Sequence, residues 1–179
     1  MAQVYVSIGS NIDRDHYISQ ALDALHKHFG GLSISSVYES EAVGFVGDNF
    51  YNLVAGFVTD LPLVELSPLL KKIEDENGRC RKGPKFSGRT LDIDILTYDD
   101  LVGIHYGVQL PRGEITKNAF VLWPLAEIAA DVAHPAIGTT YLEMWSSYDK
   151  ARQKLWSIDF QWQGRSLPCV FEALDSASG

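Results

Sequence analysis

Apolar and polar residues are arranged along this chain in patterns that predict a series of strands and helices. They alternate over residues 4–8, which predicts a half-buried strand, and Gly9-Ser10-Asn11 forms the turn that ends it. Apolar residues then recur at helical spacing over residues 18–29, and Gly30-Gly31 stops this predicted helix.

The same patterns predict three further strands and more helix towards the C-terminus. The strands cover residues 32–38, 50–59 and 91–98, and helical runs follow at about 120–130 and 139–145. With a helix between the third and fourth strands, the order is β-α-β-β-α-β. That order is typical of a ferredoxin-like α+β sandwich, in which helices pack on an antiparallel sheet. Additional C-terminal helices are expected here.

The helix between the third and fourth strands has two alternative starts. Asp60 offers an early cap, but Pro68 then lies inside the helix, where proline removes a hydrogen bond. Ser67-Pro68 is itself a good N-cap and first helical residue. In either case Gly78 ends the helix.

Length and composition fit a single domain. Of the 179 residues, 46% are hydrophobic and 21% are charged, which are ordinary values for a globular protein. No internal repeat or linker divides the chain. Residues 1–163 are expected to form the domain, and residues 164–179, which are small and polar at their end, are expected to fray.

The charge balance and the cysteines narrow the classes of partner and compartment. A formal net charge of −8 argues against broad binding to nucleic acid or anionic membranes. No apolar stretch is long enough to span a bilayer. Cys80 and Cys169 lie far apart and in no CxxC pattern, so a reducing cytoplasmic location is expected. We expect the protein to be a monomer and its partners to be small molecules.

The sharpest candidate for chemistry is the pair Asp92 and Asp94 in the fourth predicted strand. Side chains alternate along a strand, so both carboxylates lie on one face while Leu91, Ile93 and Ile95 lie on the other. Mg²⁺ is commonly held by one or two carboxylates together with substrate phosphates. The simpler alternative is a carboxylate pair on the wet face of an edge strand.

A basic segment directly precedes this strand. Residues 79–89 contain five cations, which are Arg79, Arg81, Lys82, Lys85 and Arg89. The planar guanidinium of arginine suits phosphate oxygens. A solvated loop that offsets an acidic protein is the simpler interpretation of the segment by itself. A basic loop leading into a carboxylate pair favours a magnesium–nucleotide site, and no P-loop, dinucleotide-binding or protein-kinase motif is present.

Phe50 and Asn52 form a third candidate feature, because residues two apart share one face of a strand. An aromatic ring stacks on a flat heterocycle such as a pterin, and an amide hydrogen-bonds to the polar edge of that heterocycle. A strand phenylalanine is more often part of the core, so this pair decides nothing by itself.

Five segments resemble, in order and spacing, the signature blocks of the hydroxymethyldihydropterin pyrophosphokinase family. They lie within roughly residues 3–135 and are YVSIGSN (Tyr5 to Asn11), FYN (Phe50 to Asn52), IEDENGRCR (Ile73 to Arg81), GRTLDIDIL (Gly88 to Leu96) and FVLWPLAEIA (Phe120 to Ala129). The resemblance implies an ATP-dependent diphosphotransferase of folate biosynthesis. Such an enzyme moves diphosphate from ATP onto 6-hydroxymethyl-7,8-dihydropterin with two Mg²⁺ ions.

The resemblance also implies roles for individual residues. The implied metal ligands are Asp92 and Asp94, and the implied catalytic residues are Arg79, Arg89 and Asp94. ATP contacts are implied for Glu74, Arg81, Phe86, Arg89, Ile95 and Arg112. Pterin contacts are implied for Ser40, Val43, Phe50, Asn52 and Phe120, with the two phenylalanines on either side of the ring.

Three departures from the family pattern concern phosphate contacts. Phe86-Ser87-Gly88-Arg89 stands where the family usually has Trp-Gly-Pro-Arg, and Arg112 replaces the histidine of an LPHPR-like segment. Lys117-Asn118 stand where an arginine normally precedes the stacking Phe120. The hypothesis is that Arg112 or Lys117 supplies the lost charge. The alternative is a divergent pterin- or nucleotide-binding paralogue with weak or no turnover.

Overall fold

The structure, a computed structural model, describes residues 1–41, 49–78 and 90–171. Its elements in chain order are β1 (Ala2–Ser10), α1 (Arg14–Phe29), β2 (Leu32–Ile34), β3 (Val37–Ser40), β4 (Phe50–Thr59), α2 (Leu63–Glu76), β5 (Asp92–Tyr98), β6 (Gly103–His105), β7 (Val108–Leu110), α3 (Glu114–Lys117), α4 (Ala119–Ile128), α5 (Tyr141–Ser147), the 3₁₀ helix η1 (Lys150–Arg152), β8 (Leu155–Ile158), β9 (Gln161–Trp162), β10 (Arg165–Ser166) and β11 (Cys169–Phe171). The strand predicted over residues 50–59 and the helix predicted to stop at Gly30-Gly31 are confirmed.

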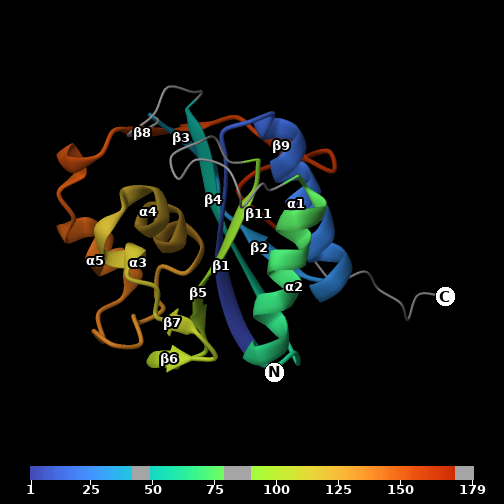
Figure 1. The fold of residues 1–179 in the computed structure, drawn as a ribbon. Helices are drawn as coiled ribbons and strands as arrows, with labels where there is room; N and C mark the ends of the chain where they lie inside the picture. The colour runs from blue at the N-terminus through green and yellow to red at the C-terminus, as the bar shows by residue number, and fades with distance from the viewer. Residues whose placement is uncertain (42–48, 79–89, 172–179) are drawn as a thin grey trace.

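A mixed α and β fold is built on one central antiparallel sheet (Figure 1). β1 lies between β4 and β5 and pairs with both in antiparallel fashion. β4 also pairs with β2 and β3, and the sheet continues from β2 to β11 and from β3 to β8. The predicted antiparallel sheet with helices packed on it is therefore confirmed. Within the described residues, no helix has the length and apolar character needed to span a bilayer.

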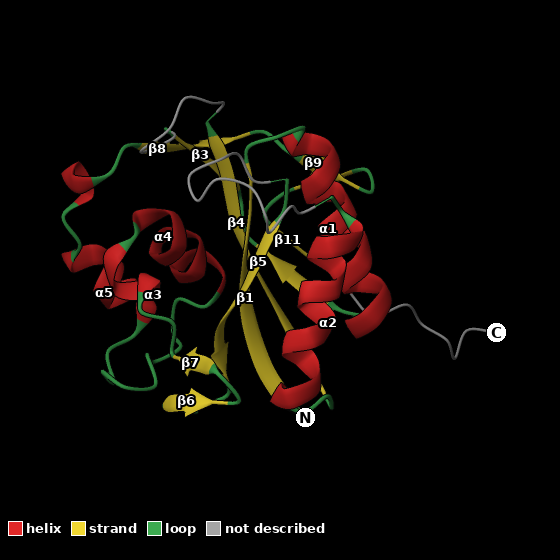
Figure 2. Cartoon of the chain, viewed as in Figure 1, coloured by secondary structure: helices red, strands yellow, loops and turns green. Residues whose placement is uncertain are grey.

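Helices cover both faces of this sheet, and β1 shows how the sequence divides the two layers (Figure 2). Val4, Val6 and Ile8 are buried in the layer formed with α1 and α2. Tyr5 points to the other face and is buried with residues of α3, α4 and α5. Ser7 lies on the face of Tyr5 because side chains alternate along a strand. The second apolar layer therefore gives way to small and polar residues towards the end of β1.

Helix α2 begins earlier than one of the two alternatives allows. Its first residue is Leu63 and its N-cap is Pro62, so Pro68 lies inside the helix and a start at Ser67 is wrong. The early start buries Leu63 and Leu66, which are 3% and 0% exposed, in the core. The carbonyl that Pro68 leaves without an intrahelical partner is that of Val64, a residue that is 47% exposed, so water can bind it.

The single strand predicted over residues 32–38 is two strands, β2 and β3, that both pair with β4. Ser35 and Ser36 interrupt them. The hydroxyl of Ser35 accepts a hydrogen bond from the Val54 amide at 2.9 Å, and Ser36 donates from its amide and its hydroxyl to the Glu127 carboxylate at 2.6 and 2.8 Å. The amides of Val54 and Ser36 thus donate to side chains, whereas in a continuous strand they would donate to backbone carbonyls of the neighbouring strand.

The chain does not fray from about Gly164 as expected, because residues 165–171 carry two short strands. β10 pairs with β9, and Cys169–Phe171 pairs with β2 at the edge of the main sheet. Leu167, between these strands, is 7% exposed and belongs to the core. Residues 172–179 lie outside the described part of the chain.

Replacing Trp162 with alanine tests how firmly the C-terminal strands belong to the core. The ring is 3% exposed, and its Nε1–H donates to Asp23 Oδ1 at 2.8 Å. We expect the free energy of unfolding, measured by urea titration, to fall by about 3–5 kcal/mol, as it does when other large buried side chains are removed. Trp156→Ala is the control, since that ring is 41% exposed and its loss should cost about 1 kcal/mol or less. Equal losses in the two variants would contradict this assignment.

Candidate active site

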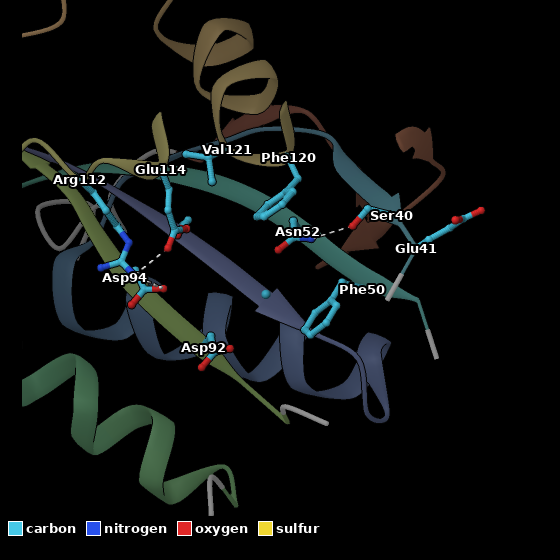
Figure 3. A pocket seen from close by; sticks show the side chains of 12 residues that line it. Ser40, Glu41, Phe50, Asn52, Asp92, Asp94, Arg112, Glu114, Phe120 and Val121 are labelled. Carbon is cyan, nitrogen blue, oxygen red and sulfur yellow. Dashed lines mark hydrogen bonds and ion pairs between the residues drawn. The ribbon is translucent and has the colours of Figure 1, made fainter. Parts of the chain in front are cut away.

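Two cavities meet at Asp94 and Arg112. The larger has a volume of about 410 Å³ and is lined by Ser7, Gly9, Ser40, Glu41, Phe50, Asn52, Asp92, Asp94, Arg112, Glu114, Phe120 and Val121 (Figure 3). The second, of about 330 Å³, lies between α2, β5 and the segment around β7 and is lined by Ser67, Leu70, Lys71, Glu74, Ile93, Asp94, Ile95, Gly107, Val108, Gln109 and Arg112. We call them the aromatic cavity and the edge cavity.

The register of three adjacent strands builds the floor of the aromatic cavity. Gly9 of β1 is the Cα partner of Asn52 in β4 and of Asp92 in β5. Two residues earlier on the same face, Ser7 is the partner of Asp94. Since side chains alternate along each strand, Asn52, Asp92 and Asp94 all point into the cavity. This placement confirms that the two carboxylates share a face.

Gly9 leaves the space that the Asn52 side chain occupies. A Cβ atom built on Gly9 lies 2.8 Å from Asn52 Oδ1, closer than real Cβ contacts allow. The Asn52 amide therefore lies over the backbone of β1, and its Nδ2 is 3.5 Å from the hydroxyl of Ser40 on β3. The position of this amide thus depends on the absence of a side chain on the neighbouring strand.

The aromatic cavity has one aromatic end and one charged end. Figure 3 shows the rings of Phe50, from the start of β4, and Phe120, from α4, on either side of Asn52. Asp92, Asp94 and Arg112 lie at the other end. A flat heterocycle fits the first end, because two rings can contact its faces while the amide binds its polar edge.

The charged end carries an excess of negative charge. Among the described lining residues at this end, the acidic ones are Asp92, Asp94 and Glu114, and the basic one is Arg112. The Nη2 atom of Arg112 lies 3.0 Å from Glu114 Oε1 and 3.7 Å from Asp94 Oδ2. One guanidinium thus faces several carboxylates, and this imbalance favours a bound cation.

The ligand set available to that cation is incomplete. In residues 1–41, 49–78 and 90–171, no group of three or more histidine, cysteine or acidic side chains is arranged to hold a metal ion. Asp92 and Asp94 supply oxygen atoms only, which is the chemistry that Mg²⁺ prefers, and Mg²⁺ takes its remaining ligands from water and phosphate oxygens. The donor set therefore fits Mg²⁺ delivered with a phosphorylated ligand.

The edge cavity brings together the described residues for which ATP contacts are expected. Glu74 comes from α2, Ile95 from β5, and Arg112 from the segment between β7 and α3. β5 is an edge strand of the described sheet, so one side of its backbone faces the cavity instead of another strand. The Arg112 amide donates to the Leu96 carbonyl at 2.9 Å, which holds the arginine beside Asp94.

Helix α4, which carries Phe120, is fixed to the sheet behind the cavity. Tyr38, the Cα partner of Asn52, is 2% exposed and packs on Trp123 of α4 with ring centroids 4.5 Å apart. Burial, and secondarily the Glu127 carboxylate, raises the pKa of Tyr38, so the phenol stays protonated and donates to Glu127. The same carboxylate binds Ser36. These contacts set the distance between α4 and β3.

All of the residues with implied metal, ATP or pterin contacts that the structure describes line one of the two cavities. The aromatic cavity contains Ser40, Phe50, Asn52, Asp92, Asp94 and Phe120, and the edge cavity contains Glu74, Asp94, Ile95 and Arg112. Outside the described residues lie Val43, Arg79, Arg81, Phe86 and Arg89.

The lining residues that sequence reasoning missed include Ser7, Gly9, Lys71 and Glu114. Three of these four residues had a signal in the sequence pattern. Ser7 and Gly9 alternate with buried residues of the first strand, and Lys71 lies three residues before Glu74 and so on the same side of a helix. Glu114 had none, because only the fold brings the start of α3 to β5.

Comparisons with known proteins agree on one family. Residues 5–130 match the model of 7,8-dihydro-6-hydroxymethylpterin-pyrophosphokinase (HPPK). Two similar curated proteins are both named 2-amino-4-hydroxy-6-hydroxymethyldihydropteridine pyrophosphokinase. The one from Aquifex aeolicus (strain VF5) is 41% identical over 137 residues, which cover 75% of this chain and 85% of that protein. The one from Bacillus subtilis (strain 168) is 36% identical over 136 residues, covering 74% and 81%.

Solved structures show the same fold at low sequence identity. Plasmodium falciparum HPPK-DHPS, wild type with pterin and p-hydroxybenzoate, has a TM-score of 0.65 and 15% identity over 82% of this chain. A triple mutant of the same protein with pteroate has a TM-score of 0.63 and 14% identity over 82% of this chain. This chain spans 43% of each of those chains. From the family match and the two bacterial relatives together, the chain belongs to the 7,8-dihydro-6-hydroxymethylpterin-pyrophosphokinase family.

Proposed function

We propose that this chain is an ATP-dependent diphosphotransferase that acts on 6-hydroxymethyl-7,8-dihydropterin, releases AMP and serves folate biosynthesis. The observation that carries the proposal is the junction of two different cavities at Asp94 and Arg112. One cavity suits a flat heterocycle, and the other runs along an edge strand beside residues expected to contact ATP. Membership of the family supports the same reaction.

The pterin is proposed to occupy the aromatic end of the larger cavity. Its ring lies between Phe50 and Phe120, which line that end, and its polar edge binds the Asn52 amide. Ser40 lies beside that amide, and Val43 is assigned to the pterin by resemblance alone. A ring held in this place directs its hydroxymethyl group towards Asp92 and Asp94. The binding step thereby aligns the hydroxyl with the phosphates and supplies much of the catalysis.

ATP is proposed to lie along the edge cavity, with its phosphates reaching Asp94. Asp92 and Asp94 would hold two Mg²⁺ ions, which would supply neutralisation of the phosphate charge that the hydroxyl has to approach. The hydroxyl oxygen bonds to the β-phosphorus and gives up its proton to solvent, and the bond from that phosphorus to the oxygen it shares with the α-phosphate breaks, which releases AMP. Glu74 and Ile95 line the cavity and contribute to nucleotide binding.

Arg112 is proposed to take over the phosphate contact of the family's histidine. Its guanidinium stands where the two cavities meet. Its Nη2 atom lies 3.7 Å from Asp94 Oδ2 and 3.0 Å from Glu114 Oε1, and all three side chains are more than a third exposed, so exchanging these ion pairs for a phosphate contact costs little. Arg112 can therefore turn to a phosphate. Roles for Arg79, Arg81, Phe86 and Arg89 remain predictions from the resemblance.

We also propose a ferredoxin-like core. The order β2-β4-β1-β5, with α1 and α2 connecting its strands, supports that assignment. Cytoplasmic location and a monomeric state remain predictions.

Asp94→Ala is the direct test of the reaction. AMP release from ATP and Mg²⁺ should require 6-hydroxymethyl-7,8-dihydropterin in the wild type. The variant should lose about 10³-fold in rate, because it lacks the carboxylate that both cavities share. The control is Asp100→Ala, which removes a carboxylate from an exposed turn and should retain full activity.

Two results would contradict the proposal. AMP release that does not depend on the pterin would indicate an ATPase. A wild type that binds pterin and an ATP analogue but releases no AMP would identify the divergent binding paralogue.

Gly9→Ala tests the role of the Asn52 amide. The added Cβ must displace Asn52 Oδ1, which would lie 2.8 Å away. We expect the affinity for 6-hydroxymethylpterin, measured by calorimetry with Mg²⁺ and α,β-methylene-ATP present, to fall about tenfold. Affinity for the nucleotide analogue alone should stay within about twofold. Gly113→Ala is the matched control, since a Cβ there meets nothing within 4 Å. Unchanged pterin affinity in Gly9→Ala would remove Asn52 from the pterin site.

A further inference from the structure

A segment beyond the family match contacts the elements that carry two walls of the aromatic cavity. Residues 148–155, here called the bridging segment, follow α5 and run along the outer side of the molecule to β8 (Figure 1). The match to the family ends at residue 130. The bridging segment therefore reaches the site from a part of the chain that the family pattern does not describe.

The bridging segment binds three consecutive residues at the junction of α3 and α4. The Tyr148 hydroxyl donates to the Lys117 carbonyl at 2.7 Å. The Nε2 of Gln153 donates to Asn118 Oδ1 at 3.0 Å, and Gln153 Oε1 accepts from the Ala119 amide at 2.8 Å. The residue that follows Ala119 is Phe120, which lines the aromatic cavity.

Gln153 acts as the cap of α4. Ala119 is the first residue of this helix and is 0% exposed, so its amide has no access to water. The first amides of a helix have no partner within the helix. Asn118 holds the N-cap position but makes no side-chain cap bond, because its Oδ1 accepts from Gln153 instead. The missing cap is thus supplied by a side chain 34 residues further along the chain.

The other end of the bridging segment is fixed to the strand that carries Ser40. Leu155 is the Cα partner of Ser40 in the β3–β8 pairing. Between the two attachments, residues 151–155 line a cavity of about 320 Å³ together with Ser40, Glu41 and Phe120. The segment therefore connects α4 to β3, the two elements that carry Phe120 and Ser40.

From these contacts we infer that Gln153 is a positioning residue for the pterin. By holding the N-terminus of α4, it sets the distance of the Phe120 ring from Phe50 and Asn52, and hence the width of the slot that receives the heterocycle. The inference rests on the proposed function, because it assigns the pterin to that slot. Gln153 does not line the aromatic cavity, so its effect on binding passes through Phe120.

The test replaces Gln153 with methionine, which keeps the length of the side chain and removes both hydrogen bonds. We expect the Kd of 6-hydroxymethylpterin, with Mg²⁺ and α,β-methylene-ATP present, and the KM of the dihydropterin to rise about tenfold. The kcat and the Kd of the analogue alone should change less than about twofold, because the edge cavity has no contact with this residue. Gln161→Met, on an exposed strand position, is the control and should change nothing.

Two further variants separate positioning from a loss of folding. Gln153→Glu keeps the acceptor for the Ala119 amide, and the Asn118 amide can rotate to donate to the second carboxylate oxygen. This variant should bind pterin within about threefold of the wild type. In a Phe120→Ala background, Gln153→Met should have no further effect on pterin affinity, because the residue through which it acts is gone.

The results that overturn the inference differ from those that overturn the function. If the wild type binds pterin and Gln153→Met binds it equally well, the inference alone fails. Equal losses of pterin and nucleotide affinity in Gln153→Met would show a merely structural role and also refute it. A wild type that binds no pterin overturns the proposed function and this inference together.

Discussion

The register of β1 between β4 and β5 is the constraint on which the site depends. It aligns Asn52, Gly9 and Asp92 in one row and puts Asp94 beside Ser7 in the next. A slip of one residue in β5 would turn the carboxylates into the apolar layer under α1 and α2 and turn Ile93 out of it. Burial of the apolar face therefore fixes where the charged face points, and the site's geometry is a by-product of core packing.

Asp94 and Arg112 join the two halves of the site because each lines both cavities. The aromatic half can bind a flat ring by contact and hydrogen bonding. The edge half lies beside β5, whose outer side has no partner strand in the described sheet. A reaction between a ring substituent and a nucleotide phosphate has to occur where the halves meet. At that junction the one described guanidinium, that of Arg112, lies beside the carboxylates of Asp94 and Glu114, and the excess of carboxylates favours a cation.

The C-terminal part of the chain completes the fold instead of trailing from it. β11 adds to β2, β8 adds to β3, and Trp162 is buried against α1. Just before β8, Gln153 supplies the cap that α4 lacks. The segment after the family match thus stabilises both the sheet edge and the helix that carries a wall of the aromatic cavity.

The sequence by itself determined the features that depend on local periodicity: the strand over residues 50–59 and the shared face of Asp92 and Asp94 both follow from the alternation of side chains. Tertiary structure decided what depends on distant partners. α2 starts at Leu63 because this start buries Leu63 and Leu66 in the core. Regular pairing of β2 with β4 ends at Ser35 because the Val54 amide donates to the Ser35 hydroxyl. Residues 169–171 form a strand because β2 offers them a free edge. A local pattern specifies which way a side chain points, whereas its contacts depend on elements far away in sequence.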